Sequence, residues 1–138
     1  MVDNENNLIF IGVVANAKGL KGDVQINYFA KDICKFKSYK YFYLGEKREK
    51  LKIQKHLISN GNFSIKFFNI NSREDAESLK NKDVFIDTNQ LGKLDDESWY
   101  HSELIGLSVE TIKGNLVGEV KAIYNFGAGD VIEIKLIS

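Results

Sequence analysis

The sequence predicts a mainly β protein made of two small β-barrels, with one short helix near residues 73–80. Polar and apolar residues alternate in short runs such as 23–29 and 107–112, and glycine or asparagine turns separate these runs. Only one segment carries helix signals. In a chain of 138 residues, many short strands with glycine turns usually close into barrels, because closure removes exposed strand edges.

The first predicted strands are the β-branched run 8–14 and the alternating run 23–29. Gly19 and Gly22 permit positive φ between them, so we expect a tight turn that carries two lysines. Further strands are predicted at 39–44, 50–57 and 62–68, and Asn60-Gly61 predicts a hairpin between the last two.

The predicted helix follows these strands. Ser72 is expected to cap its first turn, with Asp75 three residues later as in a capping box. Ala76 and Leu79 would face the core, and a strand at 84–86 completes an N-terminal domain of residues 1–94. The C-terminal domain, residues 95–138, is predicted as an antiparallel meander with strands at 107–112, 116–124 and 131–136.

The net charge changes sign between these two domains. Residues 1–94 carry 16 Lys and Arg against 11 Asp and Glu, whereas residues 95–138 carry 3 against 8. A basic domain suits a phosphate backbone and an acidic domain suits a basic protein, which together favour a ribonucleoprotein partner. Charge also varies between small domains without functional cause, and composition alone leaves that interpretation open.

Catalytic, metal-binding and cofactor-binding signals are not found in the sequence. Cys34, His56 and His101 are far apart and lack metal-ligand spacing, and we expect His56 to be a solvated histidine at a strand end. The glycine-containing segments 19–22 and 127–130 lead into strands, which disfavours nucleotide-binding loops. We therefore expect a non-enzymatic binding protein with no cofactor, metal or small-molecule substrate. A single cysteine, with no signal-peptide pattern and no membrane-length apolar run, predicts a cytoplasmic location without membrane contact.

RNA binding has positive signals. Residues 31–55 hold nine Lys and Arg against three acids, with aromatic residues interleaved, a mixture that suits phosphate contacts and base stacking. The same aromatics could fill a barrel, and we expect most to be core and one or two to be exposed. The candidate RNA-binding residues are Lys18, Lys21, Lys35, Lys37 and Lys40.

Segments 11–14, 19–24, 72–80 and 99–107, in this order and spacing, resemble the RimM family of ribosome maturation factors, also called 16S rRNA-processing proteins. The resemblance implies an N-terminal barrel of the translation-protein type and a C-terminal PRC-type barrel. It also implies a factor that binds the 30S ribosomal subunit, contacts ribosomal protein S nineteen and assists maturation of the 16S rRNA head. The family's functional aromatic pair falls on Trp99 and Tyr100, which with Glu103 are the candidate protein-binding residues.

Some alternatives stay open at this point. Trp99 and Tyr100 could instead pack across the seam between the domains, and Lys18 stands where the family usually has histidine. The family continues with further strands after the hairpin at 127–134, so we expect an incomplete second barrel that leans on the first, pairs an edge with another chain, or is partly mobile. The rival functions are a PRC-barrel interaction module without RNA binding and a small cofactor-binding barrel enzyme.

Overall fold

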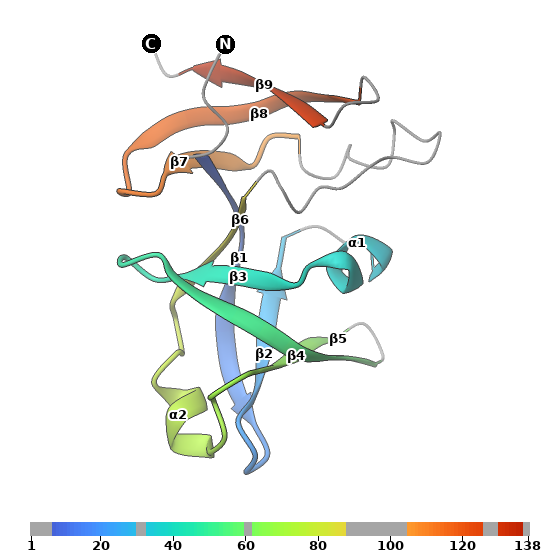
Figure 1. Ribbon diagram of the computed structural model, residues 1–138, viewed down its shortest axis with the longest axis vertical. Coiled ribbons are helices and arrows are strands. Elements are labelled where there is room, and N and C mark those ends of the chain that lie inside the picture. Colours follow the sequence, from blue (N-terminus) through green and yellow to red (C-terminus); the bar gives the residue numbers. More distant parts are fainter. Residues whose placement is uncertain (1–6, 30–32, 60–61, 88–104, 126–129, 137–138) are drawn as a thin grey trace.

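The computed structural model describes residues 7–29, 33–59, 62–87, 105–125 and 130–136, which form nine strands and two short helices (Figure 1). The elements in chain order are β1 (Asn7–Lys18), β2 (Asp23–Tyr28), α1 (Ile33–Ser38), β3 (Tyr41–Leu44), β4 (Glu49–Ser59), β5 (Asn62–Phe67), α2 (Arg73–Glu77), β6 (Asp83–Asp87), β7 (Ser108–Thr111), β8 (Leu116–Asn125) and β9 (Asp130–Leu136). This confirms the predicted mainly β class.

Strands β1 to β6 close into a six-stranded barrel. Neighbouring strands run in the order β1-β2-β5-β4-β3-β6, and β6 pairs again with β1. One strand can serve both edges because β1 is 12 residues long and shifts its register between Val14 and Ala17 and between Phe10 and Gly12. Gly12 also lets β2 approach closely, since a Cβ there would lie 2.5 Å from the Asn27 carbonyl oxygen.

The barrel interior is filled by alternate residues of the strands. In β2 and β3 the burial pattern alternates strictly, which is the pattern expected of strands with one face toward a core. Fully buried rings that include Phe36, Tyr39, Phe42 and Phe67 occupy this interior. Most of the aromatics in 36–43 are therefore core residues, as expected, while Tyr41 and Tyr43 are only partly buried.

The two helices only partly match the single helix predicted near 73–80. Helix α2 is shorter, but Ser72 caps it as expected, because its Oγ accepts the Asp75 N–H at 3.1 Å, and Ala76 and Leu79 are buried. Helix α1 was not predicted. Its six residues are too few for a helical period to show, and the ring that it buries, Phe36, reads equally well as part of a strand.

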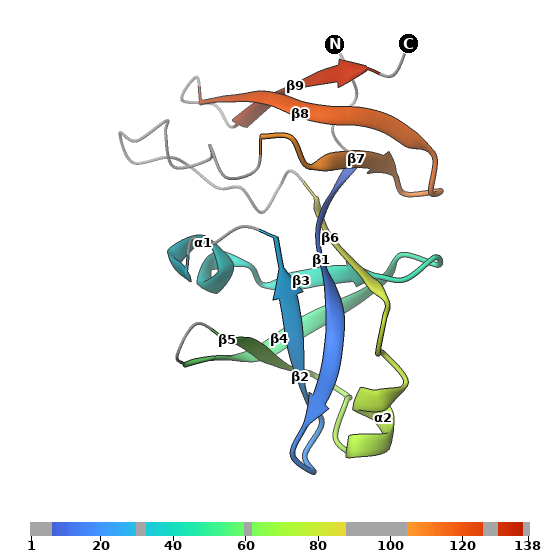
Figure 2. The same ribbon diagram turned by 180° about the vertical axis from the view of Figure 1, so that it is seen from behind.

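The C-terminal strands extend the barrel's sheet. β7, β8 and β9 form an antiparallel meander, and β7 pairs with the N-terminal end of β1 through Asn7↔Thr111, Leu8↔Glu110 and Ile9↔Val109. Figures 1 and 2 show this meander lying across one end of the barrel. Among the described residues, the meander therefore leans on the barrel, which was one of the three expected arrangements.

Candidate functional site

The predicted RNA-binding lysines lie in two separate places. Lys18 and Lys21 are exposed at the turn between β1 and β2, beside α2. Lys37 and Lys40 are exposed at α1 and the start of β3, and Lys35 belongs to α1. Both ribbon views place α1 far from the β1–β2 turn (Figures 1 and 2). The structure thus does not bring the five lysines into one patch.

The β1–β2 turn is held firmly against α2. Arg73 donates from Nη1 to the Gly19 carbonyl oxygen at 3.1 Å and from Nε to Glu77 at 3.0 Å. Gly19 and Gly22 have φ of +70° and +99°, as the two-glycine turn predicted. Lys18 and Lys21 are therefore presented on a fixed turn together with Leu20, whose side chain is 79% exposed.

The lysines at α1 surround a histidine that the sequence placed wrongly. His56 lies within β4, partly buried, and donates from Nε2 to the Tyr39 carbonyl oxygen at 2.9 Å. Burial lowers the pKa of the imidazole, and the ammonium groups of Lys40 and Lys37 lower it too, against the opposing effect of this hydrogen bond. The expectation of a solvated strand-end histidine was wrong, because β4 continues to Ser59 and carries the ring under α1 against Phe36.

A third basic group covers the outer face of β3, β4 and β5. The register opposes Tyr43 to Lys50 and Tyr41 to Lys52, and residues directly opposed in a sheet share a face. Across the next pair of strands, Lys55 opposes Lys66. We call this the lysine–tyrosine face, and it consists of Tyr41, Tyr43, Lys50, Lys52, Lys55 and Lys66.

None of the four lysines of the lysine–tyrosine face was among the predicted site residues, although a signal was present. Lys50 and Lys52 alternate with Leu51 and Ile53, so a period of two already placed the lysines on the face opposite the core. Their grouping with Lys55 and Lys66 depends on the register shift between Ile53 and Lys55, which the sequence does not reveal.

A buried carboxylate fixes the two tyrosines of this face. Both hydroxyls donate to Asp87 Oδ2, Tyr41 at 2.8 Å and Tyr43 at 3.2 Å. Burial raises the pKa of each tyrosine, and the neighbouring Asp87 carboxylate raises it further, so both rings stay neutral. The Lys50 ammonium lies 4.1 Å from the centre of the Tyr41 ring, a cation–π contact.

A second charged contact joins the barrel to the C-terminal meander. Arg48, in the turn between β3 and β4, forms an ion pair with Glu110 of β7 and donates from Nη1 to the Gly45 carbonyl oxygen at 2.8 Å. Its guanidinium lies 3.9 Å from the centre of the Phe85 ring. These contacts fix the position of β7 relative to the barrel, and a separation of 62 residues hides the pair from sequence patterns.

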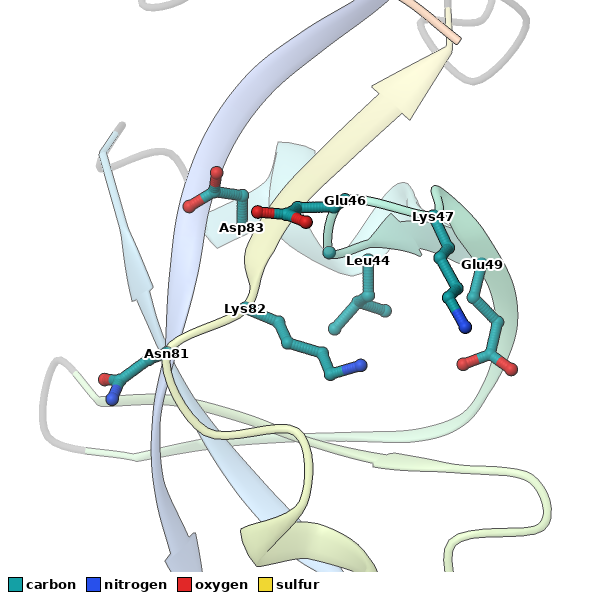
Figure 3. A pocket seen from close by; sticks show the side chains of 8 residues that line it. Leu44, Glu46, Lys47, Glu49, Asn81, Lys82 and Asp83 are labelled. Carbon is teal, nitrogen blue, oxygen red and sulfur yellow. The ribbon is translucent and has the colours of Figure 1, made fainter. Parts of the chain in front are cut away.

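A cavity of about 790 Å³ lies between the β3–β4 turn and the connection from α2 to β6 (Figure 3). Leu44 lies among side chains of both signs, which are Glu46, Lys47, Glu49, Lys82 and Asp83. The described residues contain no group of three or more His, Cys, Asp or Glu side chains placed to hold a metal ion. The mixed charges give this cavity no clear preference for an anion or a cation.

The predicted protein-binding residues Trp99, Tyr100 and Glu103 lie outside the described residues, as does His101. Within the part of the chain that the structure describes, no helix is long and apolar enough to cross a membrane.

Comparison with known proteins identifies related sequences over nearly the whole chain. The model of the RimM N-terminal domain matches residues 9–91, and that of the PRC-barrel domain matches residues 96–138. The ribosome maturation factor RimM of Ehrlichia ruminantium (strain Gardel) is 37% identical over 131 residues, which are 95% of this chain and 76% of the relative. That of Paracoccus denitrificans is 33% identical over 126 residues, which are 91% of this chain and 75% of the relative.

Two solved structures share the fold. The crystal structure of a 16S ribosomal RNA processing protein RimM from Pseudomonas aeruginosa matches with a TM-score of 0.56 at 20% identity, over 95% of this chain and 78% of that one. The solution structure of the N-terminal domain of RimM from Thermus thermophilus matches with a TM-score of 0.55 at 18% identity, over 64% of this chain and 98% of that one. With both domain models matched in order and relatives above 30% identity, the chain belongs to the RimM family.

Proposed function

We propose that this protein is a ribosome maturation factor that acts in the cytoplasm by binding the 30S ribosomal subunit. In this proposal it contacts ribosomal protein S nineteen and assists maturation of the 16S rRNA head, without covalent chemistry. The observation that carries the proposal is the match of the whole chain to relatives named ribosome maturation factor RimM. One relative of known structure is named for 16S ribosomal RNA processing.

The charges of the two halves support a division of labour. The barrel carries most of the lysines, and Lys18, Lys21, Lys37 and Lys40 are exposed on it, which suits contacts with rRNA phosphates. Lys35 belongs to the same proposed set. Residues 95–138 carry eight acids against three bases, which suits a basic ribosomal protein.

Trp99, Tyr100 and Glu103 are the proposed contacts with ribosomal protein S nineteen. Tryptophan and tyrosine supply a large contact area together with one polar group, and both are enriched among the residues that dominate binding energy at interfaces. A carboxylate beside them would add attraction to a basic partner. The factor would then favour the arrangement of the subunit head that it binds better, because a ligand shifts an equilibrium only by its difference in affinity.

Co-sedimentation tests this function. The chain would be incubated with 30S subunits, 70S ribosomes and free 16S rRNA at two salt concentrations, and we expect salt-sensitive binding that favours 30S. The double variant Trp99→Ala, Tyr100→Ala should bind 30S about 30-fold more weakly or worse, which corresponds to about 2 kcal/mol of hot-spot energy. Circular dichroism would confirm that the variant folds. Lack of selective 30S binding by the wild-type chain would refute the proposal.

A further inference from the structure

We propose that the lysine–tyrosine face binds unpaired RNA, with lysines on the phosphates and Tyr41 packed against a base. This inference rests on the proposed function, because the RNA that a 30S-binding factor meets is 16S rRNA. It adds a surface that is separate from the lysines at the β1–β2 turn and at α1.

The first argument is the charge that this face presents to solvent. Lys50, Lys52 and Lys55 are exposed, and no ion pair engages their ammonium groups within the described part of the chain. The carboxylate that adjoins the face, Asp87, is only 6% exposed and accepts both tyrosine hydroxyls. The positive charge is therefore not neutralised on the surface, as contacts with successive phosphates require.

The second argument is the fixed position of the tyrosine rings. The two hydrogen bonds to Asp87 hold the hydroxyls at the sheet, and the ring centres of Tyr41 and Tyr43 lie 5.9 Å apart in an edge-to-face arrangement. Side chains that are ordered before binding lose less entropy when a ligand arrives. Tyr41 is thus prepared to receive a flat or cationic group without rearrangement of its own ring.

The third argument is the position of Lys50. Its ammonium lies over the face of the Tyr41 ring, so that ring face is already in contact with a polar group rather than with apolar core. A base that stacks there would displace the ammonium, and the flexible four-carbon stem of Lys50 would let it move to a neighbouring phosphate. Stacking and phosphate contact can therefore be made together at this position.

The same features favour unpaired RNA over a protein or a duplex. Lysine is depleted at the centres of protein interfaces, whereas this face is built mainly from lysine. A base can pack on an aromatic ring only where it is unstacked from its neighbours, which in rRNA means loops, bulges and single strands. Duplex RNA would reach the lysines but leave Tyr41 without a partner.

Fluorescence anisotropy with labelled RNA tests the inference. The probes are a mixed-sequence single strand of about 12 nucleotides, within the usual site size for such surfaces, and a duplex of the same length. Lys52→Ala combined with Lys55→Ala should weaken single-strand binding and reduce the slope of log K against log salt by about 1.4, or about 0.7 for each phosphate contact. Lys113→Ala, which removes an exposed lysine from the β7–β8 turn, is the matched control and should change neither quantity.

The tyrosine variants separate stacking from charge. Tyr41→Ala should weaken single-strand binding about 5-fold or more while the salt slope stays unchanged, as expected for the loss of one stacked base. Tyr41→Phe keeps the ring and should retain most of the affinity, and it controls for damage to the fold. A wild-type chain that does not bind the single strand, or that binds the duplex equally well, would overturn the inference, as would lysine variants with unchanged affinity and slope.

The outcome for the proposed function is read separately, by co-sedimentation of the same variants with 30S subunits. Wild-type binding to 30S together with RNA binding that ignores the face substitutions would reject the face and keep the function. Single-strand binding through the face without any wild-type binding to 30S would keep the face and reject the function.

Discussion

Single buried polar groups determine how this surface is presented. Asp87 is the last residue of β6, and its Oδ2 accepts hydrogen bonds from two tyrosines of β3. Without these bonds the carboxylate would lie buried and unpaired, which is costly, so the three side chains stabilise one another. The sequence offered Tyr41 and Tyr43 as aromatic candidates, but their partner is more than 40 residues away and was not foreseen.

His56 makes the stability of the chain depend on pH at the level of one residue. Its pKa in the folded state is below the ordinary value of 6.5, chiefly because the ring is buried. Above pH 6.5 both folded and unfolded states are neutral and the contribution is complete. As the pH falls below 6.5 the unfolded state binds a proton first, so stability is lost until the lower, folded pKa is reached.

We therefore expect the unfolding free energy of the wild type, relative to His56→Gln, to decrease from pH 7.5 to pH 5. Glutamine can still donate to the Tyr39 carbonyl oxygen but does not titrate, so the comparison isolates the imidazole. Urea unfolding at several pH values provides the measurement. A difference that stays constant across this range would show that the ring is not shielded from protonation.

At the scale of elements, the β1–β2 turn shows which part of a local pattern is predictable. Two glycines three residues apart predicted the turn, and both have positive φ. The sequence does not distinguish their roles. A Cβ at Gly22 would lie 2.1 Å from the Ile70 carbonyl oxygen, whereas a Cβ at Gly19 would have nothing within 4 Å.

This difference predicts unequal costs for the same substitution. Gly19→Ala should lower the unfolding free energy by about 1 kcal/mol, the cost of a left-handed conformation for alanine. Gly22→Ala should cost about 3 kcal/mol or more, because the backbone around Ile70 must move as well. Denaturant unfolding of both variants gives the comparison. Equal losses would mean that the approach of Ile70 is looser than the structure shows.

At the scale of the whole molecule, the C-terminal meander and the barrel are joined by strand pairing and by one ion pair. β7 continues the sheet through β1, and Arg48 reaches across from the β3–β4 turn to Glu110. The side chains of Arg48 and Glu110 are only 6% and 20% exposed. Arg48 Nε also has no hydrogen-bond partner among the described residues, so the guanidinium depends strongly on its remaining contacts.

Removing this pair should therefore weaken the attachment of the meander. We expect Glu110→Ala to destabilise the chain by about 3 kcal/mol, since it leaves Arg48 buried without a counter-charge. A double-mutant cycle with Arg48→Ala should give a coupling energy of about 1 kcal/mol or more. The exposed pair Arg73–Glu77, with side chains 48% and 55% exposed, is the control, and its cycle should give less than about 0.5 kcal/mol. Similar coupling energies in the two cycles would contradict a clamping role for Arg48.

The sequence by itself determined the fold class, most strands, the cap at Ser72 and the turn at Gly19 and Gly22. These features depend on neighbours within a few residues, through side-chain alternation, local hydrogen bonds and backbone conformation. Only the tertiary structure decided that the predicted lysines lie apart, that Lys50, Lys52, Lys55 and Lys66 share a face, and that Arg48 meets Glu110. Those arrangements depend on the register and closure of the barrel, which bring together residues that are distant in the chain and leave no periodic trace in the sequence.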